Sequence, residues 1–152
     1  MENVLTEIKS EHDEVRALLK KIDGYERVNW DTVEELYVTL KGHHDAEEEV
    51  LFPKVRTLNK KAEELIAHLE EEHDDTEDMI LKMIEAHTFD REQFQEVYTD
   101  ITEHMEDEET ELFAKSKKAL STEALEDALD PFEAAEKKAQ KKAEKEVKEA
   151  TK

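Results

Sequence analysis

The feature that most constrains this chain is an internal repeat, in which a pattern of histidines and glutamates occurs twice at a constant offset of 61 residues. The matched pairs are His12 with His73, His43 with His104, and Glu47 with Glu108. A repeat of this kind restricts the fold to architectures built from two copies of one unit. The halves, about residues 3–58 and 61–119, are each predicted to be a helix with one histidine followed by a helix with His-x-x-x-Glu.

Apolar side chains in both halves follow the spacing of helices that bury one face. They recur three and four residues apart over about residues 3–23, 31–58, 61–86 and 90–119. Near the middle of each segment a histidine takes one of these inward positions. Four helices of similar length with short connections favour an up-down-up-down bundle, in which the midpoints lie at one height. The predicted fold is therefore all-α, with a four-helix bundle over residues 1–120.

The ends of the predicted helices are marked by residues with known positional preferences. Asp31 and Asp90 are predicted N-cap residues, because each is followed three positions later by Glu or Gln. Pro53 is expected to lie near the end of the second helix or to kink its last turns, since proline has no backbone N–H to donate.

Residues 121–152 differ in composition and are predicted to form a charged helical tail. Asp130 and Pro131 are typical of a helix start. Beyond them the apolar stripe consists mostly of Ala139, Ala143 and Val147. Such a thin stripe buries little, so we expect an exposed helix that frays.

The bulk composition excludes several classes of function. A net charge of −21 repels phosphate backbones, so no nucleic-acid partner is expected. No apolar run approaches the roughly 20 residues that a membrane span requires, and the N-terminal residues lack the pattern of a signal peptide. The absence of cysteine rules out thiolate metal sites. We expect a cytoplasmic protein; the composition does not set its oligomeric state and is compatible with a monomer.

The buried histidines and glutamates indicate a metal centre. Imidazole and carboxylate groups are costly to bury without partners, and two carboxylates at one level of a core repel each other. Divalent cations remove both penalties, and this combination of ligands without sulfur suits iron, manganese or zinc. The four-residue spacing puts the two side chains of each motif on one helix face, about 40° apart. We therefore expect two metals bridged by Glu47 and Glu108.

The pattern His12, His43-x-x-x-Glu47, His73 and His104-x-x-x-Glu108 resembles the hemerythrin-like (HHE cation-binding) family over about residues 3–118. The resemblance implies a bundle of the hemerythrin type, here with an additional polar C-terminal helix. It implies two iron ions (Fe²⁺/Fe³⁺) with a bridging oxo or hydroxo group, and a small diatomic partner, O2 or NO, for oxygen binding or sensing. The alternatives are a di-iron enzyme acting on peroxide or NO and an iron storage or repair protein. Binding and catalysis are not separated by the sequence, and no catalytic residue is predicted.

The chain departs from the oxygen-carrying members of that family at one position. Those proteins have a further histidine one turn after the lone histidine of the third helix, and here that position is Glu77. Glu77 is a candidate seventh ligand, and the change favours a sensing, storage or redox role over simple oxygen carriage. The register His44 with Glu48 also has the required spacing, but only His43 with Glu47 preserves the repeat and the inward stripe.

Overall fold

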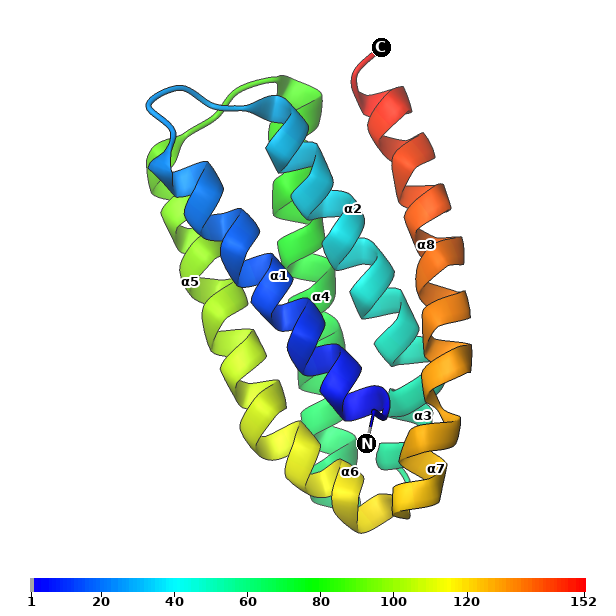
Figure 1. Cartoon of the computed structure of the whole chain (residues 1–152). Helices are drawn as coiled ribbons and strands as arrows, with labels where there is room; N and C mark the ends of the chain where they lie inside the picture. The colour runs from blue at the N-terminus through cyan, green and yellow to red at the C-terminus, as the bar shows by residue number, and fades with distance from the viewer. Residues whose placement is uncertain (1) are drawn as a thin grey trace.

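The computed structural model describes residues 2–152, which form a bundle of long helices that run alternately up and down (Figure 1). The elements are α1 (Val4–Gly24), α2 (Trp30–Ala46), η1 (Glu47–Leu51), α3 (Phe52–Val55), α4 (Lys60–Ala86), α5 (Arg91–Asp107), η2 (Glu108–Leu112), α6 (Phe113–Ala119), α7 (Thr122–Asp127) and α8 (Leu129–Ala150). The segments α2–η1–α3 and α5–η2–α6 are continuous helices. The predicted all-α, hemerythrin-type bundle with an additional C-terminal helix is confirmed.

The N-termini of the four bundle helices are capped by asparagine or aspartate side chains. Asn3, Asn29, Asn59 and Asp90 each accept hydrogen bonds from backbone N–H groups of the first turn. The prediction of Asp90 is confirmed, whereas that of Asp31 is wrong. Asn29 lies two residues earlier and is an equally good acceptor, so α2 begins at Trp30.

The second and fourth helices both widen into π-helical segments, η1 and η2, at matched positions of the repeat. Each segment begins at the glutamate of its His-x-x-x-Glu motif. Pro53 lies near the end of this helix, as predicted, because η1 precedes it and α3 ends at Val55. The second copy has Ala114 at the matched position and the same π-helical segment, so proline is not its cause. Short π-helical insertions are frequent at functional sites.

The core consists of two apolar clusters separated by a layer of buried polar side chains. Ile8, Phe52 and Leu112 belong to the cluster near the chain's N-terminus, and Leu19 and Leu36 belong to the cluster at the opposite end. Burial of each such side chain contributes about 1.5–3 kcal/mol. Among the described helices, none has the length and apolar character needed to cross a membrane.

The C-terminal helix α8 packs against the bundle, chiefly along α2 (Figure 1). Its inward residues Phe132, Ala139, Ala143 and Val147 are all buried. The expectation of an exposed, fraying tail is therefore wrong. Alanine is a weak apolar residue, but its small side chain allows two helices to approach closely. At Gly42 of α2 the approach is so close that an added Cβ would lie 2.5 Å from the Cγ atom of Gln140.

Candidate metal centre

The structure brings together the six residues that the repeat singled out. One group contains His12, His43, Glu47 and Glu108, and a second contains His73 and His104 with the same two glutamates. Within each group, one nitrogen or oxygen atom per residue lies within 4.8 Å of those of the others. The histidines come from α1, α2, α4 and α5, and the glutamates from η1 and η2. Since both glutamates belong to both groups, the arrangement fits two adjacent cations that share two carboxylates.

Several of these buried atoms have no hydrogen-bond partner. Both carboxylate oxygens of Glu47 are unpaired although the residue is fully buried, and so are Oε2 of Glu108 and Nε2 of His43. The Nε2 atoms of His43 and His73 lie 3.3 Å from Oε1 of Glu47, without the geometry of a hydrogen bond. An unpaired buried polar group costs about 1–3 kcal/mol, and native proteins rarely keep several together. Bound cations would satisfy all of them.

Five buried histidines lie in the polar layer between the two apolar clusters, and the Nδ1 atom of each lies against the carboxylate of a different glutamate. The pairs are His12 with Glu109 at 2.7 Å, His43 with Glu11 at 2.6 Å, His44 with Glu77 at 2.7 Å, His73 with Glu48 at 3.0 Å and His104 with Glu72 at 2.9 Å. A carboxylate accepts and does not donate, so Nδ1 carries a proton and Nε2 is the ring atom that is left to face a cation once it is deprotonated. Such carboxylate–histidine pairs are the usual outer shell of protein metal sites.

Four of these carboxylates follow the same repeat as the histidines, because Glu11 is matched by Glu72 and Glu48 by Glu109. The inward stripe of apolar residues and histidines alone would place Glu48 and Glu109 on a solvated face. Their side chains are in fact 31% and 19% exposed, with the carboxylate turned inward to a histidine. The signal that identifies them is the 61-residue offset itself.

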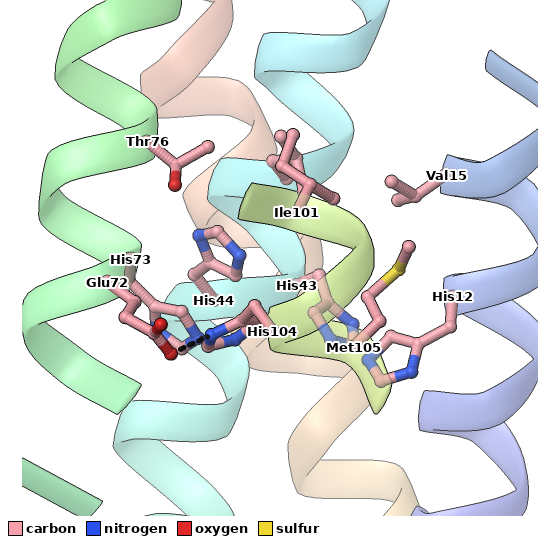
Figure 2. A pocket seen from close by; sticks show the side chains of 11 residues that line it. His12, Val15, His43, His44, Glu72, His73, Thr76, Ile101, His104 and Met105 are labelled. Carbon is pink, nitrogen blue, oxygen red and sulfur yellow. Dashed lines mark hydrogen bonds and ion pairs between the residues drawn. The ribbon is translucent and has the colours of Figure 1, made fainter. Parts of the chain in front are cut away.

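His44 is the buried histidine that sequence reasoning set aside. It is only 3% exposed, forms a group with His73 and His104, and stacks on the ring of His73 with centroids 3.7 Å apart (Figure 2). A bundle helix contacts two neighbouring helices, so positions about 100° apart can both face the core. His43 faces Glu11 of α1, whereas His44 faces α4.

Glu77 lies beside His44 and not among the grouped residues. One of its oxygens accepts the Nδ1 proton of His44, and the other lies 3.2 Å from the Nζ atom of Lys41. Burial raises the pKa of Glu77 to about 7, although the charge of Lys41 opposes the shift. In this arrangement Glu77 holds the ring of His44, which lies in one group with His73 and His104.

The histidines of the layer differ in their affinity for protons. Burial alone would lower the pKa of His104, but the carboxylate of Glu108 raises it to about 9. Burial and the nearby charges of His73 and His104 lower the pKa of His44 well below its usual value. Burial and the charge of Glu108 raise the pKa of Glu47. His44 is therefore neutral and ready to bind a cation, whereas His104 must release a proton to do so.

A small cavity opens on one side of the histidine layer (Figure 2). Its volume is about 10 Å³, room for about one water-sized molecule. Besides the five histidines, its walls include the apolar side chains of Val15, Leu40, Ile101 and Met105. The cavity therefore suits a small uncharged molecule in contact with the metal positions.

The two remaining histidines, His68 and His87, lie away from the layer. The side chain of His68 is 61% exposed. His87 ends α4 in the left-handed region, with φ of 52°, and stacks on Trp30.

Comparison with known proteins gives two findings. The family model described as "Hemerythrin HHE cation binding domain" matches residues 3–116. A protein named DNA nickase, from Nostoc sp. (strain PCC 7120 / SAG 25.82 / UTEX 2576), is 27% identical over 149 residues, which is 92% of this chain. The chain spans 41% of the length of that relative. No solved structure matches the chain to a significant degree.

Proposed function

The chain belongs to the hemerythrin HHE cation-binding family, and from this premise we propose that it is a non-haem di-iron protein that binds O2 or NO, for oxygen binding or sensing. The observation that carries the proposal is the set of unpaired, fully buried carboxylate oxygens of Glu47 and Glu108 where the two histidine groups meet. A metal-free core would not retain these charges at a cost of about 1–3 kcal/mol per unpaired group.

The ligands divide into two unequal sets. Glu47 and Glu108 are common to both metal positions. One position is completed by three histidines, which are His44, His73 and His104. The other is completed by two, which are His12 and His43. Iron bound there would supply electrons and an open coordination position for the small ligand.

The protein's own side chains make the two positions unequal. The repeat matches His44 with Met105, a buried residue that offers no imidazole. The two-histidine position therefore keeps a place free for the small molecule. Met105 and Val15 line the cavity beside it and limit the entry of water.

An enzyme acting on peroxide or NO is the second candidate, and the outer shell favours it. Five carboxylates accept hydrogen bonds from the Nδ1–H groups of the five histidines of the layer, which makes these histidines more basic. Negative charge around a centre stabilises its more oxidised state. A centre held in the ferric state reacts with peroxide more readily than it carries O2. Cleavage of DNA, which the relative's name specifies, is disfavoured here by the net charge of −21.

The test begins with anaerobic reconstitution with ferrous iron, a measurement of iron per chain, and visible spectra during addition and removal of O2. Two irons with a coloured adduct that disappears reversibly would support oxygen binding. Two irons that oxidise irreversibly, with turnover of peroxide, would support the enzyme. Absence of bound metal would contradict both.

A further inference from the structure

The C-terminal helix reaches the metal centre through three residues spaced four apart. Phe132, Glu136 and Gln140 lie on one face of α8, the face turned to the bundle. Phe132 is fully buried and presents its edge to the ring of His43, with centroids 6.1 Å apart. Gln140 lies over Gly42, the residue next to His43 in α2. Two contacts of α8 therefore flank a single histidine.

The third residue contacts the carboxylate that orients this histidine. Glu11 accepts a hydrogen bond from Nδ1 of His43 at 2.6 Å, and one carboxylate oxygen of Glu136 lies within 4.8 Å of both an oxygen of Glu11 and a ring nitrogen of His43. Two carboxyl groups can share a hydrogen bond only if one carries a proton. Burial and the neighbouring Glu11 raise the pKa of Glu136 to about 9, so Glu136 is the group that carries the proton and faces Glu11 as a donor.

The corresponding carboxylate of the second half has no such cover. Glu72, the match of Glu11, accepts from His104, but its side chain is 30% exposed and lines a surface hollow with His68 and Asp75. The side chain of Glu11 is 8% exposed. The helix α8 thus encloses the outer shell of one metal position and leaves that of the other open to solvent.

We propose that α8 is part of the metal centre, and that Glu136 is a positioning residue that fixes Glu11 and through it His43. The inference rests on the proposed function, since it assumes that His43 binds a cation. Glu136 holds the carboxylate of Glu11 in the orientation that keeps the proton on Nδ1 and directs Nε2 of His43 at the two-histidine position. The three-histidine position has no contact of this kind.

The test is an anaerobic titration with Co²⁺, whose two binding steps are followed by calorimetry and by the visible spectrum. Glu136→Ala should weaken the step of the two-histidine position roughly tenfold, the lower end of outer-shell effects. Glu136→Gln should restore it, because the amide N–H can donate to Glu11 as the protonated carboxyl does. Glu144→Ala is the matched control, because it removes the same side chain from an exposed position of α8.

Two further readouts separate positioning from a general loss of packing. Glu11→Ala should weaken the same step as Glu136→Ala, and Glu72→Ala should weaken the other. The paramagnetically shifted Nδ1–H resonance of one histidine should move in Glu136→Ala and return in Glu136→Gln. Equal weakening of both steps, or no change in either, would overturn the inference while the proposed function stood. Failure of the unaltered protein to bind Co²⁺ would overturn the proposed function itself.

Discussion

Replacing Glu47 by glutamine should stabilise the metal-free protein and abolish most of its stabilisation by metal. Glu47 is fully buried, and neither of its oxygens has a hydrogen-bond partner. It also faces Glu108, whose charge raises the pKa of Glu47 after the effect of burial. Glutamine has nearly the same shape, removes the repulsion and can donate its N–H to Glu108.

The magnitude follows from the cost of an unpaired buried polar group, about 1–3 kcal/mol. The free energy of unfolding of the metal-free variant should exceed that of the unaltered protein by an amount in this range. For a chain of this length that is about 2–4 °C in Tm per kcal/mol. Metal at a hundred times its Kd stabilises a one-site protein by about 2.7 kcal/mol, and this gain should largely disappear with the shared carboxylate.

The assay is urea unfolding followed by circular dichroism, with and without metal, in the chelator-treated protein. Glu49→Gln is the matched control, because it removes the same charge from an exposed position of η1. It should leave both curves unchanged. The reasoning would be refuted if the metal-free Glu47→Gln protein were less stable than the control, or if metal increased its free energy of unfolding as much as that of the control.

Three further predictions concern other parts of the molecule. His44→Ala should reduce bound metal below two per chain, as measured by elemental analysis, whereas a histidine outside the centre would leave it unchanged. The pKa of His104 is raised to about 9 in the metal-free protein, so the stabilisation that protonated His104 contributes is complete below about pH 6.5 and is lost as the pH rises through 9. Urea unfolding should therefore show lower stability at pH 9 than at pH 6.5. Equal stability at the two pH values would contradict this. Gly42→Ala should destabilise the protein by roughly 1 kcal/mol, because displacing the Gln140 side chain costs more free energy than alanine gains in helix propensity. Gln140→Ala should remove this destabilisation. Gly24→Ala, with nothing within 4 Å of the added Cβ, should not destabilise it.

The sequence predicts the bundle and the converging residues because both depend on local spacing. The helical period alone identifies the inward stripes that contain His12 and His104, and the repeat shows which positions in the two halves correspond. The same repeat identifies Glu48 and Glu109 when it is applied to every carboxylate, and not only to those of the His-x-x-x-Glu motifs. A simple division into buried and solvated faces misplaces these residues, since their side chains are partly exposed while one carboxylate oxygen of each accepts a hydrogen bond from a buried histidine.

Other features depend on packing that periodicity does not describe. The inward stripe includes His43 and excludes His44, because it allows only one residue per turn to face the core. A helix that packs against two neighbours buries a wider face, and His44 lies on it. The docking of α8 depends on shape: Ala139 and Ala143 contribute little apolar area, but they fit closely against α2 near Gly42. The π-helical segments have no residue that marks them, since η1 precedes a proline and η2 does not.

The departures from the repeat bear more directly on function than the repeat itself. Two identical halves would provide two equivalent metal positions, each with the same number of histidines. Here His44 is matched by Met105, and α8 covers Glu11 but not Glu72. In the proposed di-iron centre, one position would therefore have more ligands and an open outer shell, and the other would have fewer ligands and an enclosed one. Metal should fill the three-histidine position first. The small molecule should then bind at the second position, where the enclosed shell holds the ligands still while one coordination place remains free.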